Sequence, residues 1–135
     1  MYPTRSRTQF YVVIVCTIVF LDVAGSVASR VMHFDYTNLV WVSWGAYAST
    51  GYLGFSFGRL VGGAVAGLVA GMADGTIGWL LSTIIKPQVP STHHELTVLS
   101  VCLVIATVAL LGAFLGFLGA LVRLPFESRE KSAGA

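Results

Sequence analysis

Glycine recurs at every fourth position within a long apolar segment in the middle of the chain. The four glycines are Gly63, Gly67, Gly71 and Gly75, and Asp74 lies among them. Glycines at this spacing share one face of a helix, and a face without side chains lets a second membrane helix approach closely. An acid within a membrane span is by default a candidate functional residue. The segment therefore predicts a tightly packed membrane helix that carries an ionisable group.

The composition is that of a membrane protein. Of 135 residues, 56% are hydrophobic and 10% are charged, whereas soluble domains have about 25% charged residues. A bilayer core of about 30 Å requires roughly 20 helical residues. Four apolar runs reach this length, at residues 9–29, 38–58, 60–85 and 97–122. We therefore expect a single all-α membrane domain over residues 1–135, a compact bundle of four transmembrane helices followed by a polar tail at 123–135.

The basic residues are unevenly distributed between the two sides of this topology. With a cytoplasmic N-terminus, the outer side holds only Arg30 and Lys86. The basic residues of the inner side are Arg5, Arg7, Arg59, Arg123, Arg129 and Lys131. Because cytoplasmic segments carry an excess of Lys and Arg, we expect both termini and the tail in the cytoplasm. The loop-poor plan suggests a multi-pass protein of a cell membrane, with the bacterial cytoplasmic membrane as the first choice.

A different interpretation of the first segment stays open. Arg5 and Arg7, the apolar run 10–21 and the small residues that follow resemble a cleavable signal peptide. Asp22 directly after the run argues against cleavage. Removal of this segment would leave three spans, so the intact mass of the purified protein distinguishes the two interpretations.

Three of the four expected helices carry a stripe of small residues. On the helix at 60–85, the glycines and Asp74 share one sector of the helical wheel, while bulky residues occupy the opposite sector. Lipid tails provide no hydrophobic drive for helix association, so close packing of small residues must supply it. The residues expected to pack helices together are Gly63, Gly67, Gly71, Gly75, Gly54, Gly58, Gly112 and Gly116. Surplus stripes are available for contacts between protomers.

The first helix carries the second membrane acid. Asp22, Gly25, Ser26 and Ser29 follow the helical spacing i, i+3, i+4, i+7, so the outer half of this helix has a small, polar face. The first and third helices run in the same direction, and both acids lie near the membrane midplane. We therefore expect the carboxyl groups of Asp22 and Asp74 to line one polar pocket.

Two further polar residues lie at a similar depth on the second helix. Tyr47 and Thr50 complete the predicted site, which is expected to bind an ion, a proton or a substrate. No Lys or Arg occurs within any span, so each acid must be protonated, hydrated, bound to a cation or paired across a subunit interface.

A polar segment precedes the last span. Thr92 and Glu95 have the spacing of a capping box, which gives Glu95 a structural role. His93 and His94 adjoin Glu95, but neighbours in sequence project about 100° apart on a helix and do not converge on a metal by themselves. We therefore expect neither a metal site nor a cofactor.

These features predict a small transporter or channel that moves protons or cations past Asp74 and Asp22. In its four short spans and membrane-embedded acid, the chain is similar in architecture to the small multidrug-resistance transporters. The key acid of that family is a glutamate in the first span, no motif of the family occurs here, and the charge bias departs from its near-symmetric members.

An alternative function needs no chemistry from the acids. The chain would then be a non-catalytic structural or accessory subunit, docked by its small-residue stripes in a larger membrane complex or a homo-oligomer. An enzyme is not expected, because no nucleophile stands beside a base. A formal charge of +2 with scattered basic residues also gives no reason to expect nucleic-acid binding.

Overall fold

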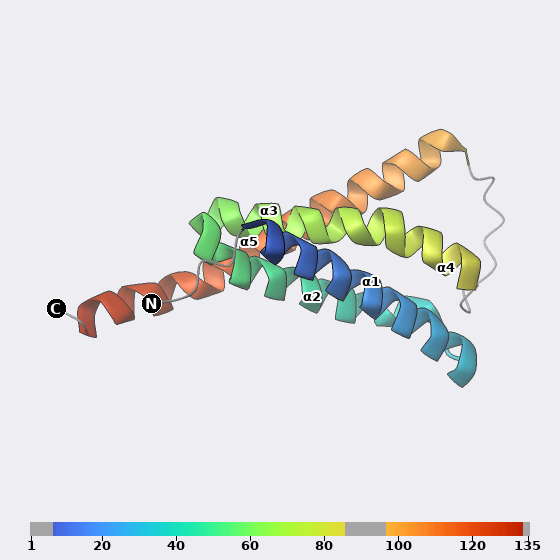
Figure 1. Cartoon of the computed structure of the whole chain (residues 1–135), viewed down its shortest axis with the longest axis horizontal. Helices are drawn as coiled ribbons and strands as arrows, with labels where there is room; N and C mark the ends of the chain where they lie inside the picture. Colours follow the sequence, from blue (N-terminus) through green and yellow to red (C-terminus); the bar gives the residue numbers. More distant parts are fainter. Residues whose placement is uncertain (1–6, 86–96, 134–135) are drawn as a thin grey trace.

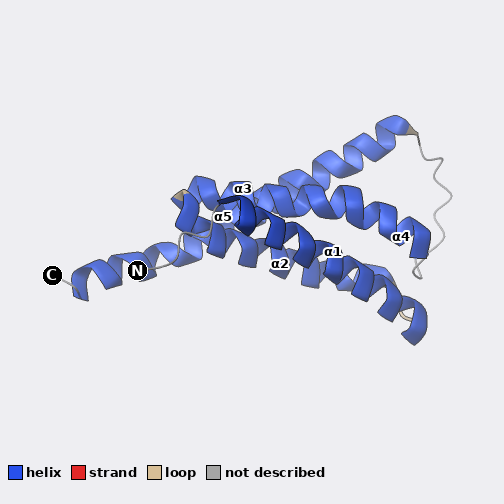
Figure 2. Cartoon of the chain, viewed as in Figure 1, coloured by secondary structure: helices blue, strands red, loops and turns tan. Residues whose placement is uncertain are grey.

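The protein is helical throughout the part of the chain that the structure describes. The computed structural model describes residues 7–85 and 97–133, and no strand occurs within these ranges (Figure 2). The α-helices are α1 (Arg7–Met32), α2 (Val40–Gly54), α3 (Arg59–Ala73), α4 (Trp79–Ile85) and α5 (Val98–Ala133). Short 3-10 helices, η1 (Tyr36–Leu39) and η2 (Phe55–Phe57), flank α2, and a π-helical turn, η3 (Asp74–Gly78), joins α3 to α4. The all-helical prediction is confirmed for these residues.

Three segments are long and apolar enough to cross a membrane. They are Arg7–Met32, Arg59–Ile85 and Val98–Phe126, and the second of them comprises α3, η3 and α4. The remaining expected segment, at residues 38–58, contains α2. This helix has 15 residues, fewer than the roughly 20 that cross a bilayer core. With η1 and η2 the helical path around α2 runs from residue 36 to residue 57.

The structure adds detail to two of the expected segments. The segment at 60–85, expected as one helix, changes its winding at η3. Residues 123–133, expected as a polar tail, continue α5 as helix through Pro125. The tail is rich in Glu, Arg and Lys, which are good helix formers, and extending an existing helix avoids the cost of nucleating a new one.

Helix α3 lies at the centre of the bundle. It packs against α5, α2 and α1, and α2 also packs directly against α5. In Figure 1, α1 passes in front of the bundle, and the first half of α5 (orange) leads away from α1 and α2. Helix α4 contacts α1. The chain is therefore most closely packed around α3 and more open around α4.

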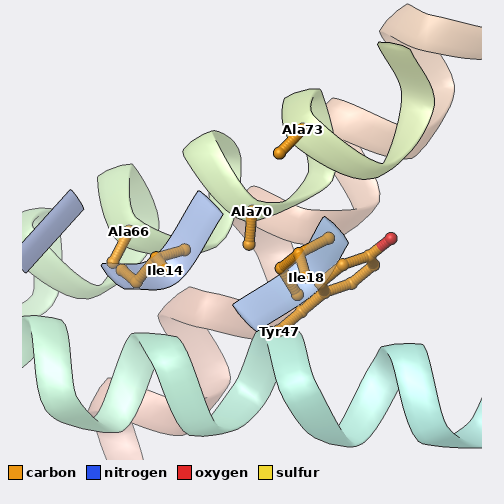
Figure 3. Packing of buried hydrophobic residues seen from close by; sticks show 6 residues of the cluster. All are labelled: Ile14, Ile18, Tyr47, Ala66, Ala70 and Ala73. Carbon is orange, nitrogen blue, oxygen red and sulfur yellow. The ribbon is translucent and has the colours of Figure 1, made fainter. Parts of the chain in front are cut away.

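The hydrophobic core lies between α1, α2 and one face of α3 (Figure 3). Alanines on α3 face two isoleucines of α1 and one tyrosine of α2. These buried residues are Ile14, Ile18, Tyr47, Ala66, Ala70 and Ala73. The alanines recur with the i, i+4, i+7 spacing of one helix face, so α3 has a small-residue face toward α1 and α2 as well as its glycine face.

The glycine face of α3 meets α5 backbone to backbone. A Cβ atom on Gly67 would overlap the carbonyl oxygen of Gly112, and one on Gly116 would lie 2.5 Å from the carbonyl oxygen of Gly63. A Cβ on Gly71 would lie 2.5 Å from the carbonyl oxygen of Val108. Such approaches allow Cα–H···O contacts between helices, which larger side chains would prevent.

The remaining predicted packing glycines differ in their surroundings. A Cβ on Gly75 would lie 3.3 Å from the Cα of Ile105 on α5, which is tight but without backbone overlap. Gly54 lies where α2 meets α3, with a hypothetical Cβ 2.7 Å from the carbonyl oxygen of Gly62. Gly58 is the exception: it is exposed, and its nearest atoms belong to Gly62 in the first turn of α3. It forms the joint that begins α3, so it does not lie between two helices.

Candidate functional site

The two membrane acids meet where α1 passes η3. Asp22 lies in α1 and is 5% exposed, and Asp74 is the first residue of η3. Gly78, at the end of η3, lies against both: a Cβ there would be 2.8 Å from Asp22 Cγ and 3.1 Å from Asp74 Oδ1. The absence of a side chain at Gly78 therefore leaves the space in which the two carboxyl groups approach each other.

The π turn η3 sets the direction in which Asp74 points. We expected Asp74 to share the glycine face of its helix. In the structure those glycines face α5, whereas the Asp74 carboxyl contacts α1 and α2. A π turn holds one residue more than an α-turn and changes the register of the helix, and such turns are frequent at functional sites. Because the winding changes at Asp74 itself, a wheel at 100° per residue does not describe its direction.

Two phenols hold the outer oxygens of the acid pair. The Tyr47 hydroxyl donates a hydrogen bond to Asp74 Oδ2. The Tyr36 hydroxyl donates to Asp22 Oδ1 at 3.5 Å. Tyr36 is positioned by η1, whose first turn is capped by Asp35 Oδ1 accepting from the Thr37 amide at 2.9 Å.

Two buried oxygens in the site have no hydrogen-bond partner. Among the side chains that the structure describes, which leave out residues 82 and 127–133, these are Asp22 Oδ2 and Ser26 Oγ, and Ser26 is 0% exposed. The two residues are one helical turn apart on the same face of α1. Buried polar atoms are almost always paired. A buried carboxyl oxygen and a buried hydroxyl one turn apart are therefore the least well paired polar atoms of the site.

Not every polar residue predicted for the site reaches it. Thr50 is buried, but its hydroxyl donates to the carbonyl of Tyr47 in its own helix at 2.8 Å. Tyr47, in contrast, joins the acid pair directly. Ser26, Tyr36 and Gly78 complete the site without having been predicted as members. Ser26 had a signal in its spacing from Asp22, whereas Tyr36 lies in a short connection where periodicity gives no information.

No basic side chain is available within the helices that carry the acids. The sequence has no Lys or Arg between Arg7 and Arg30 or between Arg59 and Lys86. The Arg30 guanidinium instead donates to the carbonyl of Ile85 at 2.9 Å, which ties the end of α1 to the end of α4. The polar neighbours described for the acid pair are thus two phenols and the Ser26 hydroxyl, and no Lys or Arg lies on its own helices to compensate the charge.

The predicted capping and histidine cluster lies outside the described residues. Thr92, His93, His94 and Glu95 belong to the segment 86–96. In the described ranges, no group of three or more His, Cys, Asp or Glu side chains is placed to hold a metal ion.

Comparison with known proteins gives no further guide to the site. No protein-family model matches the chain, and no curated protein and no solved structure matches it. The functional argument therefore rests on the geometry of the acid pair.

Proposed function

We propose that this protein is a small transporter or channel that moves protons or other cations across a membrane through the Asp22 and Asp74 pair. The observation that carries the proposal is the meeting of two carboxyl groups over Gly78 without a basic partner in their helices. A pair of carboxylates in a medium of low polarity is stable only when protons or a cation offset the charge. Loading and unloading of this positive charge is the elementary step of ion transport.

The depth of both acids supports this function. Asp22 lies 15 residues after the start of α1 and 10 before its end, and Asp74 lies 15 residues after Arg59 and 11 before Ile85. At about 1.5 Å per residue, both acids are close to the middle of their segments. Ionisable groups at this depth typically mark ion or proton pathways.

The proposed topology has four spans with both termini in the cytoplasm. The helical path at 36–57 supplies the fourth span, with η1 and η2 extending α2 at both ends. The bias of basic residues supports the orientation. In this arrangement Arg30 lies at the outer ends of α1 and α4, and Arg59 and Arg123 lie on the cytoplasmic side of a cell membrane, bacterial by the loop-poor plan.

Flux measurements in liposomes test the proposal. The purified chain is reconstituted, a membrane potential is imposed, and proton entry is followed with an internal pH-sensitive dye, with parallel assays for sodium and potassium. We expect flux from the wild type, and its loss in Asp74→Asn and Asp22→Asn. Thr107→Val is the matched control, because the exposed Thr107 hydroxyl donates only to Leu103 of its own helix.

The alternative function is an outcome of the same experiment. If the wild type carries neither protons nor alkali cations while both Asn variants fold and assemble normally, transport through the acid pair is wrong. The accessory-subunit or homo-oligomer role would then be the function to pursue, with co-purifying membrane partners as the next measurement.

A further inference from the structure

We propose that the cytoplasmic end of the bundle binds the headgroup of an anionic phospholipid through the guanidinium groups of Arg59 and Arg123. These two residues form the arginine pair, and they come from the start of α3 and the second half of α5. In Figure 1 the joint that leads into α3 (green) lies toward the end of the bundle where the C-terminus is marked. The acid pair lies elsewhere, near the middle of the spans, so this inference is independent of it.

One aromatic ring gathers the two positive charges. The guanidinium carbon of Arg59 lies 5.9 Å from the centre of the Phe55 ring, and that of Arg123 lies 5.5 Å from the same centre. A guanidinium within about 6 Å of an aromatic ring is attracted by it. Phe55 is buried, so its ring is a fixed part of this end of the bundle. Two positive charges at one ring also repel each other, and an anion bound by both offsets the repulsion.

The backbone of Arg59 is strained. Its φ of 55° lies in the left-handed region, which is uncommon for a residue with a side chain. Glycine adopts this conformation without a steric penalty, yet the chain has an arginine here, directly after Gly58. Strained residues are frequent at binding sites, where the surrounding structure holds them. A binding role for the exposed Arg59 side chain explains why the strain is kept.

Arg123 is oriented by the protein through one of its nitrogens. Its Nη1 atom donates to the carbonyl of Tyr52 at 3.2 Å and to Ser56 Oγ at 2.7 Å. A guanidinium has five N–H groups, so Nε and Nη2 carry donors that these two bonds do not use. The planar arrangement of such donors matches the oxygens of a phosphate group. Arg123 is therefore a preoriented donor for a phosphate.

The depth of the arginine pair selects a lipid over a soluble anion. Arg59 is the first residue of its apolar segment, and Arg123 lies three residues before the end of another. Both are therefore at the level where the hydrocarbon core gives way to headgroups. Val122, next to Arg123, and Leu53, next to Tyr52, are exposed apolar residues. They offer a surface to the acyl chains of a bound lipid, from which a free phosphate ion gains nothing.

The charge of this end of the bundle favours an anionic partner. On the side that carries the termini in the proposed topology, six basic residues stand against two acidic ones, Glu127 and Glu130. On the other side, Arg30 and Lys86 are balanced by Asp35 and Glu95. Each Lys or Arg near a membrane surface adds to the attraction for anionic lipids. A phospholipid with net negative charge, such as phosphatidylglycerol, is therefore the expected ligand class.

Thermal melts of the full chain in nanodiscs of two compositions test the inference. One nanodisc contains phosphatidylcholine alone, and the other contains phosphatidylcholine with phosphatidylglycerol. A ligand that binds the folded state raises the melting temperature, so we expect a higher value with phosphatidylglycerol. Titration of the protein in detergent with fluorescent phosphatidylglycerol gives the affinity, which should fall about fivefold on loss of either arginine.

Arg59→Gly separates lipid binding from folding. Glycine relieves the left-handed backbone, so this variant should melt no lower than the wild type in phosphatidylcholine. It should nevertheless lose most of the rise caused by phosphatidylglycerol. Arg123→Gln should also lose this rise, from a lower starting temperature because two hydrogen bonds are removed. Arg30→Gln is the matched control: Arg30 donates to the carbonyl of Ile85 at the other end of the bundle, and its variant should keep the full rise.

Four outcomes would overturn the inference. The wild type could melt at the same temperature in both lipids, or Arg59→Gly could keep the full rise. An equal loss in Arg30→Gln and Arg59→Gly would show attraction by overall charge and no defined site. An equal rise caused by inorganic phosphate in phosphatidylcholine alone would assign the arginine pair to a soluble anion. Flux through the acid pair is measured separately, so each of these results leaves the proposed function standing.

Discussion

Helices α3 and α4 belong to one apolar segment, yet they pack in different ways on the two sides of the π turn. Before the turn, α3 packs through glycine and alanine, with backbone against backbone on α5. After the turn, α4 contacts α1, and the junction between them holds Asp22 and Asp74. In the first region, the small residues let the helix backbones approach closely, and this close packing stabilises the contact. The second region brings together buried polar groups, which cost stability unless they are paired.

This difference separates the expected effects of substitution. Changes on the α3 and α5 contact should affect folding and assembly, since a closely packed backbone cannot move aside. Changes around Gly78 should affect ion handling, with smaller effects on folding.

The largest loss of stability is expected from Gly67→Leu. A side chain there would overlap the carbonyl of Gly112 and the backbone of Gly116, so α3 and α5 would have to separate. We expect a loss of about 3 kcal/mol in stability, seen as a lower melting temperature and a loss of monodisperse protein in size-exclusion chromatography. Gly45→Leu on α2 is the control, because a Cβ there meets nothing within 4 Å. Equal stability of the two variants would contradict the close contact.

The next largest effect is a loss of cation flux, which is expected from Gly78→Ala because this change displaces a carboxyl group. The added methyl group would overlap Asp22 Oδ2 and displace the Asp22 carboxyl from Asp74. We expect cation flux to fall about tenfold or more, since misplacement of about 1 Å can cost far more than this in a binding site. Flux assays and melting curves measured side by side provide the test.

Gly75→Ala is the matched variant in the same turn. Its Cβ would lie 3.3 Å from the Cα of Ile105, away from the carboxyl groups. It should lower stability slightly and leave flux unchanged. If Gly78→Ala and Gly75→Ala reduce flux equally, the effect comes from the π turn and not from the acid pair.

A smaller effect is expected from Tyr47→Phe. The change removes the donor to Asp74 Oδ2 and keeps the buried ring in the core. We expect a roughly tenfold loss of proton or cation flux with a stability change of about 1 kcal/mol, as for one ordinary hydrogen bond. Tyr52→Phe on the exposed side of α2 is the control. Identical flux in both variants would remove Tyr47 from the site.

The smallest effects are expected at the arginines that tie helix ends together. Arg123 donates to the carbonyl of Tyr52 at 3.2 Å and to Ser56 Oγ at 2.7 Å, and its guanidinium lies 5.3 Å from the Tyr52 ring centre. Arg123→Gln should cost about 1 kcal/mol. Arg30→Gln removes one hydrogen bond, to the carbonyl of Ile85, and should lower the stability by about half as much. Thermal melts measure both, and a larger effect at Arg30 would show that the more open end limits stability.

The sequence was a good guide to the helices and to the candidate acids. Apolar runs of sufficient length and the i, i+4 spacing of small residues depend on simple periodicity, which a single sequence displays. The meeting of Asp22 and Asp74 in the structure agrees with their equal depth on two helices that run in the same direction. The exposed position of Gly58, by contrast, depends on how the chain turns into α3, for which a stripe of small residues gives no information.

The parts that escaped prediction depend on local winding and on short connections. The π turn has no distinctive sequence, and it changes the direction of Asp74 relative to the glycines that precede it. Tyr36 reaches Asp22 from η1, where a four-residue element has no periodicity to analyse. The helical tail after Pro125 appeared polar by composition, because its helix depends on continuity with α5 and not on an apolar face.

The position of α1 at the side of the bundle has a consequence for the order of assembly. Helices α2, α3 and α5 contact one another extensively, whereas α1 rests mainly on α3, η3 and α4. A folding intermediate of three helices is therefore expected before α1 docks, although α1 is the first to be synthesised. Such an intermediate holds Asp74 and Tyr47 but not Asp22. The pair of Asp22 and Asp74 is thus expected to be the last feature of the molecule to form during biogenesis.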